Sequence, residues 1–222
     1  MSGCRIASGL CVTLALAGCA AQQTAPAQSS GQAPAAEASP ESTPRAAARA
    51  RLRAVIRDQS FLDHLSDSVR ATTISEPFSG RMVILYLVDD RGAARGAQDA
   101  DLAESGVTRE ALRAVVEWNL EQVLKERLTC TSHALTEPAR HGFYESSRLL
   151  LDKQWARLAA TAGTVVVAAP SNDTLFVACN PSPETLQKLA VIVQNTYPQA
   201  ARPVSPALLT WSNDGWRELP AP

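Results

Sequence analysis

Apolar side chains recur with two different periods along the chain, and these periods predict helices in some segments and strands in others. Residues 81–90, RMVILYLVDD, form an apolar run rich in β-branched side chains, which predicts a buried strand. Residues 107–128 carry apolar side chains every three or four positions, which predicts an amphipathic helix with Thr108 as its N-cap. Asn119 falls inside the apolar stripe, and we expect it to bond a neighbouring backbone rather than to act in catalysis.

Residues 46–58, AAARARLRAVIRD, also fit a helical period, with Leu52, Val55 and Ile56 on one side. Arginines recur every four positions and would form a basic face on that helix: Arg45, Arg49, Arg53 and Arg57. Such a face could contact anionic lipid, or it could simply be a solvated helix surface. Both interpretations stay open at this point.

The carboxyl-terminal half alternates between short apolar runs and turn residues. Residues 128–135, around Cys130, are a candidate strand, and residues 143–159 are predicted to begin extended and to end as a helix near Asp152–Ala160. Two hairpins are predicted, over 163–179 around PSND and over 208–219 around Asn213–Gly215. Ser182 followed by Pro183 is typical of a helix start.

Strands mixed with helices and joined by hairpins indicate an α+β fold. We expect residues 46–222 to form a single α+β domain with a mixed, largely antiparallel sheet packed with two to four helices.

The amino-terminal segment has the layout of an export signal. Residues 1–18 contain one cation, Arg5, and then an apolar stretch too short for a comfortable membrane span. The sequence Leu16-Ala17-Gly18-Cys19 resembles a bacterial lipobox, which implies that Cys19 is lipidated and becomes the first residue of the mature chain. An ordinary signal peptide with a chance cysteine is the alternative. Ala20 resembles the residue that sorts lipoproteins to the outer membrane.

The segment after Cys19 contains no large apolar residue. Residues 20–45 are rich in Ala, Pro, Gln and Ser, so they cannot bury enough surface to offset the entropy of ordering. We therefore predict that residues 19–45 form a lipidated cysteine and a disordered linker, dispensable for folding. The expected location is the periplasmic face of the outer membrane, with the lipid bilayer as one partner through acylated Cys19 and an envelope protein as a possible second.

Net charge excludes one large class of function. The chain has 21 basic and 22 acidic side chains, whereas a nucleic-acid-binding protein needs a clustered basic surface. We expect no nucleic-acid partner.

Four sequence pieces, in order, carry a resemblance to a known family. They are VTREAL with WNL in the predicted helix, then YESSRLLL, then GTVVVAAPSNDTLFVA, and finally RPVSPALLTWSNDGWREL. Over residues 81–219 the chain resembles the domain-of-unknown-function 1444 family of bacterial proteins. Ser146 departs from the family pattern, which tends to have alanine there. The resemblance implies no activity, because the family has none assigned.

Candidate catalytic chemistry is sparse. The histidines at 64, 133 and 141 are too scattered for a metal pair at helical spacing, and no Cys-x-x-Cys pair or Gly-rich phosphate loop is present, so we predict no metal and no cofactor. Ser147, His141 and Asp173 could form a hydrolytic triad, although no nucleophile-elbow motif surrounds the serine.

Two hypotheses follow from this sparse set. The first is a non-catalytic, membrane-tethered interaction or accessory module. The second is a hydrolase-like enzyme with a site around Tyr144, Ser147 and Asp173. Convergence of Ser147 and Asp173 in one cleft would distinguish them.

Cys130 and Cys179 are the only cysteines after Cys19. In an oxidising compartment two such thiols are candidates for a disulfide. The alternative is two separate buried thiols that act as small apolar residues. A Cα–Cα distance above about 7 Å would exclude the bridge.

Overall fold

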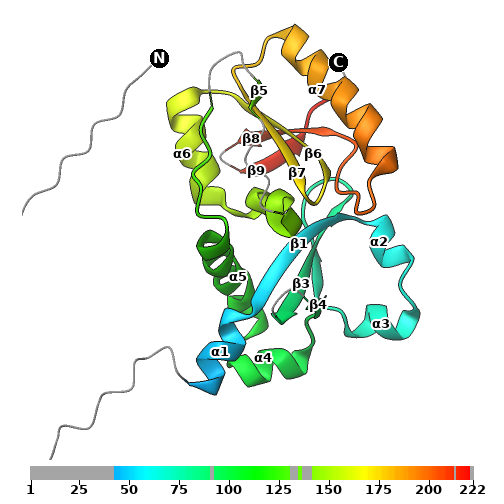
Figure 1. Cartoon of the computed structure of the whole chain (residues 1–222), viewed down its shortest axis with the longest axis vertical. Coiled ribbons are helices and arrows are strands. Elements are labelled where there is room, and N and C mark those ends of the chain that lie inside the picture. Colours follow the sequence, from blue (N-terminus) through cyan, green and yellow to red (C-terminus); the bar gives the residue numbers. More distant parts are fainter. Residues whose placement is uncertain (1–42, 91–92, 131–134, 137–141, 213, 221–222) are drawn as a thin grey trace, which may run out of the picture. The chain divides into compact units, whose positions relative to one another are not determined.

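The computed structural model describes residues 43–90, 93–130, 135–136, 142–212 and 214–220, which all lie in one unit, Ala38–Pro222. The predicted signal peptide, Cys19, His133 and His141 lie outside the described residues. The α+β class and the antiparallel pairing that the sequence predicts are confirmed, with the strands divided between two sheets (Figure 1).

The first sheet is built around β3 (Met82–Asp90), the strand predicted over 81–90. β1 (Leu52–Asp58) pairs with one edge of β3, while β2 (Ser75–Pro77) and β4 (Ala93–Gly96) share the other edge. Val55 stands opposite Leu85 in the register. Because side chains alternate between the faces of a strand, Val55 and Arg57 point to one face, and Ala54 and Ile56 to the other.

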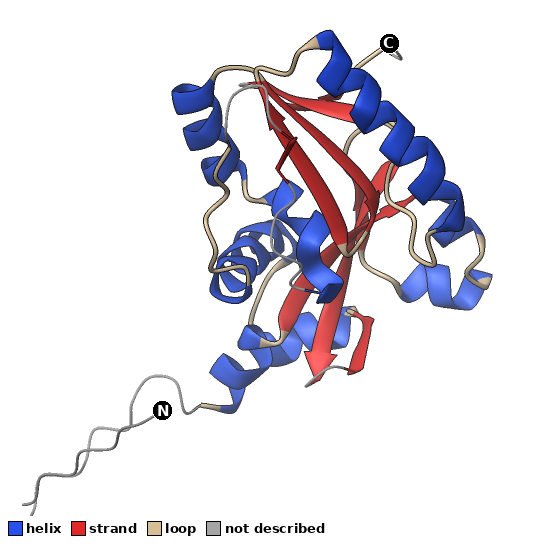
Figure 2. Ribbon diagram, turned by 45° about the horizontal axis from the view of Figure 1, so that its top comes forward, coloured by secondary structure: helices blue, strands red, loops and turns tan. Residues whose placement is uncertain are grey.

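The second sheet has the strand order β5-β7-β6-β8-β9. It contains both predicted hairpins, β6–β7 and β8–β9, with these bounds: β5 Leu135–Thr136, β6 Val165–Ser171, β7 Thr174–Cys179, β8 Leu208–Ser212 and β9 Gly215–Glu218. α7 (Pro183–Thr196) begins at the predicted Ser182 cap and packs Leu189 and Val193 on one face of this sheet. Figure 2 shows this long helix lying along the strands.

The two sheets meet at a short extended segment around Pro203. The Asp58 N–H at the end of β1 donates to the Pro203 carbonyl over 3.1 Å, and Pro203 bridges to Ser171 at the end of β6. The apolar faces of both sheets therefore contribute to one core. This junction also brings the residue before it, Arg202, close to the end of β1.

A buried 3₁₀ helix, η2 (Gly142–Leu150), lies between the sheets. The prediction that this segment begins extended is wrong. The fully buried Glu145 and Arg148 form an ion pair across three residues, 2.6 Å apart, and a helical turn is what brings them together. The Trp155 indole N–H, on α6 (Asp152–Ala162), donates to the Arg148 carbonyl over 2.6 Å. α6 confirms the helix predicted for the second part of the segment.

The helix predicted over 46–58 is only half right. A helix, α1 (Pro44–Ala50), ends before Leu52, and the rest of the segment is β1. Leu52–Asp58 has buried side chains on both faces, and pairing with β3 bonds its backbone while both faces stay packed. Arg53 and Arg57 are therefore on a strand, so the predicted basic helix face does not form.

The folded region also begins slightly earlier than predicted. The Thr43 hydroxyl accepts the Ala46 N–H and caps α1, inside the segment assigned to the linker. The Arg45 side chain packs closely over Gly106, where a Cβ would clash with it. Gly106 has a φ of 63° and ends α4 (Asp99–Ser105) in the left-handed conformation.

The predicted amphipathic helix is α5 (Arg109–Val123), and the Thr108 hydroxyl caps it by accepting the Ala111 N–H. The expected role of Asn119 is confirmed, since its amide donates to the carbonyls of Arg49 and Leu52 over 2.9 and 2.8 Å. Short helices that the sequence pattern did not reveal complete the described elements: α2 (Ser60–Asp63), α3 (Asp67–Thr72) and η3 (Tyr197–Gln199).

The structure joins Cys130 to Cys179 by a disulfide, with Cα atoms 5.9 Å apart. This separation lies within the range that a disulfide spans. The bridge connects the segment after α5 to the end of β7.

Candidate functional site

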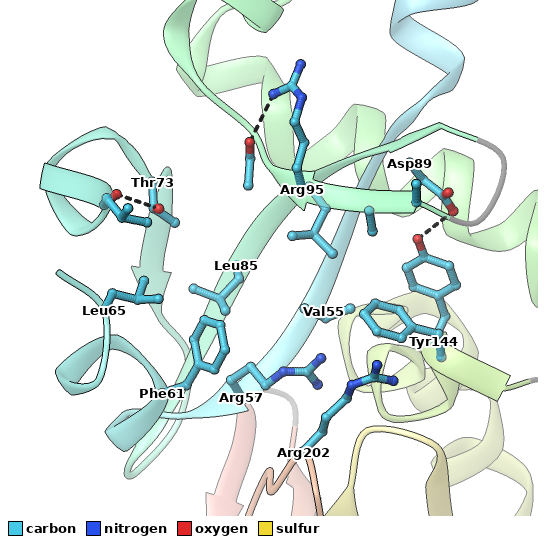
Figure 3. Close-up of a pocket in the computed structure, with 16 residues that line it drawn as sticks. Val55, Arg57, Phe61, Leu65, Thr73, Leu85, Asp89, Arg95, Tyr144 and Arg202 are labelled. Carbon is cyan, nitrogen blue, oxygen red and sulfur yellow. Dashed lines mark hydrogen bonds between the residues drawn. The ribbon is translucent and has the colours of Figure 1, made fainter.

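A groove of about 610 Å³ lies against the face of the first sheet to which Val55, Leu85 and Leu87 point. The sheet, the α2–α3 segment, β4, the start of η2 and the Pro203 segment all line it (Figure 3). Its lining residues are Val55, Arg57, Phe61, Leu65, Val69, Thr73, Leu85, Leu87, Asp89, Ala93, Ala94, Arg95, Gly96, Phe143, Tyr144 and Arg202.

The floor of the groove is apolar because of strand alternation. Val55 on β1 and Leu85 and Leu87 on β3 all point to this face. Two rim side chains from the α2–α3 segment stay open to solvent: Phe61 is 42% exposed and Val69 48% exposed. An apolar floor with an exposed apolar rim is typical of a surface that binds an organic ligand.

Arg57 is the most unusual side chain in the groove. It follows Val55 in the alternation of β1 and is only 4% exposed. Its guanidinium lies 5.4 Å from the ring centre of Phe143 and 6.0 Å from that of Phe61, and its hydrogen bond goes to the adjacent Ile56 carbonyl over 3.3 Å. Among the described residues, no carboxylate lies within ion-pair distance of it.

Burial and the neighbouring charges lower the pKa of Arg57 to about 10. Loss of solvation is the largest cause and the positive charge of Arg202 the second, while Asp173 acts in the opposite direction. Arg57 is still charged at neutral pH, so the groove holds a poorly compensated buried cation.

Arg202 approaches the same aromatic ring from the Pro203 segment. Its guanidinium lies 4.6 Å from the ring centre of Phe143, and Figure 3 shows the ends of Arg57 and Arg202 side by side. Unlike Arg57, Arg202 is exposed. The two arginines and Phe143 form what we call the arginine end of the groove.

Tyr144 and Asp89 occupy a different part of the groove. The Tyr144 hydroxyl donates to a carboxylate oxygen of Asp89 over 2.7 Å. Burial, and then this hydrogen bond to a carboxylate, raise the pKa of Tyr144 well above its usual value. The phenol therefore stays protonated at neutral pH and is not a nucleophile.

The third arginine of the groove is already neutralised. Arg95 makes two hydrogen bonds to Asp101, over 2.8 and 2.5 Å. The hydrogen bond to Asp101 is the largest cause that raises the pKa of Arg95. Arg95 is therefore less available to a ligand than Arg57.

The candidate hydrolytic residues do not converge. Ser147 is fully buried, and its hydroxyl donates to the Ala54 carbonyl over 2.9 Å. Asp173 is exposed in the β6–β7 turn, where it accepts a hydrogen bond from Ser171 and lines a separate shallow hollow of about 510 Å³. Ser147 lines neither hollow. His141 lies outside the described residues, so the third member of the triad cannot be placed.

Ser146 is also buried, and within the described ranges its hydroxyl has no hydrogen-bond partner. Its backbone N–H donates to the Asn172 carbonyl over 3.0 Å, which fixes η2 against the β6–β7 turn. Ser146 and Ser147 therefore act in packing.

The described lining of the groove is poor in the side chains that most often act as nucleophiles or bases. Within the described parts of the chain, its lining includes no serine, cysteine, histidine or lysine. The one aliphatic hydroxyl, on Thr73, donates to the Val69 carbonyl over 2.8 Å. The described residues also contain no group of three His, Cys, Asp or Glu side chains that could hold a metal ion.

Sequence reasoning missed Arg57 and Arg202 as site residues. The period of residues 46–58 placed Arg57 on a solvated helix, whereas its flanking residues Ala54-Val55-Ile56 carry a strand signal that could have placed it correctly. No local signal marks Arg202, because the Pro203 junction alone brings it to β1.

We compared the chain with protein-family models, curated proteins and solved structures, and nothing matches. The resemblance to the domain-of-unknown-function 1444 family therefore stays a prediction. Across the ranges that the structure describes, no helix has both the length and the apolar character needed to cross a membrane.

Proposed function

We propose that this protein is a non-catalytic, membrane-anchored binding module of the bacterial envelope, and that the groove on the first sheet is its ligand-binding site. The lipobox ending in Cys19 supports the anchor, and Ala20 supports placement on the periplasmic face of the outer membrane. On this proposal the anchor and linker hold the module near the bilayer, and the groove takes up a ligand there.

One observation carries the binding role. The groove combines an apolar floor, an exposed apolar rim and the buried cation Arg57, which has no carboxylate partner among the described residues. A few polar groups in a mostly apolar hollow are the usual composition of a ligand site. A purely structural surface gains nothing from a buried, unpaired charge.

The hydrolase-like alternative has weaker support. A serine nucleophile must reach solvent and contact a base, but the Ser147 hydroxyl is buried and bonded to the Ala54 carbonyl. The Tyr144 phenol is held protonated by Asp89 and by burial. A binding role requires neither group to react.

Binding of a neutral apolar probe tests the groove without reference to its charge. We would titrate 1-octanol into the mature chain carrying Cys19→Ser, which removes only the acyl chains, and measure heat by calorimetry. Ala94→Trp on β4 should fill the groove and weaken binding at least about tenfold. Ala103→Trp, on the exposed side of α4 outside the groove, is the matched control. Equal binding by both variants would contradict the proposal.

A further inference from the structure

The arginine end of the groove points to a particular class of ligand. We propose that Arg57 and Arg202 bind the carboxylate of an amphipathic monoanion whose apolar body lies on the floor of the groove. This inference rests on the proposed function and adds to it the charge and chemistry of the ligand.

Most of the guanidinium donors at this end are not used by the described residues. Arginine carries five N–H donors in a flat fork, and among the described residues the Arg57 side chain donates only to the Ile56 carbonyl. The Arg202 guanidinium makes no hydrogen bond or ion pair with any described residue, and it lies against the ring of Phe143. Both guanidinium groups rest on that ring, which leaves donors at their edges for a carboxylate.

The local charges favour one negative charge on the ligand. Arg57 and Arg202 contribute two positive charges, and the carboxylate of Asp173 lines a hollow together with Arg202 and also acts on Arg57. Asp89, elsewhere in the groove, is already bonded to Tyr144. The arginine end therefore has an excess of one positive charge, which a carboxylate balances and a dianionic phosphate would exceed.

The apolar floor of the groove determines the chemistry of the ligand beyond its carboxylate. Val55, Leu85 and Leu87 form an apolar floor beside the arginine end but are themselves already buried, whereas Phe61 and Val69 on the rim are exposed. A hydrocarbon body in the groove would meet no polar side chain on the floor and would gain by covering the exposed rim side chains. Because the groove is open along the rim formed by Phe61 and Val69, a body longer than the floor can extend into solvent.

The experiment compares three probes that share one chain length: octanoate, octyl phosphate and 1-octanol. Each is titrated at pH 7 into the mature chain carrying Cys19→Ser and followed by calorimetry. We expect octanoate to bind at least about tenfold more tightly than octanol, as a charge-assisted hydrogen bond predicts. Octyl phosphate should bind more weakly than octanoate.

The variants separate a binding role from a structural one. Arg57→Met should remove the advantage of octanoate over octanol. Arg202→Met should reduce the advantage by a smaller factor, because that side chain is exposed. Arg95→Met is the matched control, since Arg95 lines the same groove but is paired with Asp101, and it should leave the advantage intact. Arg57→Lys keeps the positive charge but not the planar set of guanidinium donors, so it should retain part of the affinity advantage of octanoate over octanol.

The possible failures are distinguishable. Equal binding of octanoate and octanol by the parent chain would overturn this inference and leave the proposed function standing. An unchanged octanoate advantage in Arg57→Met would also overturn it. Tighter binding of octyl phosphate than of octanoate would indicate a phosphate ligand and would contradict the assignment of a monoanion. Binding of none of the three probes would overturn both the inference and the proposed function.

Discussion

Replacing Arg57 by methionine should stabilise the ligand-free protein, although it removes a buried side chain with two aromatic contacts. Methionine has a similar length, is apolar and adapts to irregular cores. The substitution therefore removes the charge of Arg57 and keeps most of the packing around β1. A buried charge without a partner opposes folding, because water solvates it better in the unfolded chain.

The structure gives the size of this effect. A pKa of about 10 for Arg57, well below the ordinary value for arginine, corresponds to roughly 3 kcal/mol against the charged form. The contacts with Phe61 and Phe143 return about 1–2 kcal/mol, which methionine loses. The net gain for Arg57→Met is about 1–2 kcal/mol, or a rise in Tm of roughly 3–6 °C.

The pH dependence of this gain follows from the direction of the shift. Arg57 is charged in both the folded and the unfolded chain below pH about 10, so the whole effect is present at neutral pH. Above pH about 10 the folded chain begins to release the proton and the effect diminishes. The difference between the variant and the parent chain should therefore be constant from pH 6 to 9.

Urea unfolding followed by tryptophan fluorescence measures the effect, because Trp155 and Trp216 are buried in the core. Arg57→Lys is the control, since it keeps a charge at the same position and should give no gain. An unfolding free energy for Arg57→Met that is lower than that of the parent chain by about 1 kcal/mol or more would contradict a destabilising role for the buried charge. Such a result would mean that the charged Arg57 side chain stabilises the folded protein.

Four further predictions test other parts of the molecule. The double variant Cys130→Ser, Cys179→Ser opens a loop of 49 residues and should lose about 4 kcal/mol, seen as a Tm lower by roughly 10 °C; an unchanged Tm would show that the thiols are not bridged. Burial raises the pKa of Asp58, but hydrogen bonds from Ser60, Arg81 and Tyr197 outweigh it and leave the pKa below its usual value. Asp58→Asn should therefore lower the unfolding free energy above pH about 4, and the difference should vanish as pH falls through the lowered pKa; a difference that grows in acid would contradict this. Cys19→Ala should leave the protein unprocessed or soluble after cell fractionation, and unchanged processing and membrane retention would exclude lipidation. Thr43→Ala should cost about 1 kcal/mol in thermal unfolding because it removes the α1 cap, whereas a chain that begins at Ser42 should melt like the full chain.

The elements that the sequence predicts correctly are those with a long or well-marked pattern. The run over 81–90 is buried along almost its whole length in β3, so its composition alone indicates a strand. Thr108 and Ser182 mark helix starts by a local hydrogen bond that needs no tertiary context. The hairpins around residues 171–174 and 212–215 have their turn residues within the sequence of the hairpin.

The errors lie where distant contacts override a local period. The Leu52–Asp58 segment fits a helical period, but pairing with β3 some 30 residues later makes it a strand. The start of η2 has apolar and polar residues without clear period, and the buried Glu145–Arg148 pair makes it helical. The candidate site depends on both segments, since β1 positions Arg57 and η2 positions Phe143.

The nitrogen-15 NMR signal of the Arg57 side chain reports on carboxylate binding in the groove, because the Nε–H group would itself contact a bound carboxylate. Octanoate is added at pH 7 to the labelled mature chain carrying Cys19→Ser, with Arg57→Met used to assign the signal. The account predicts a saturable shift of the Arg57 Nε–H signal, shared by backbone signals of β1, β3 and Phe143, and a much smaller shift with octanol. An Arg57 signal that does not move while octanoate shifts residues elsewhere would contradict the assignment of the groove as the binding site.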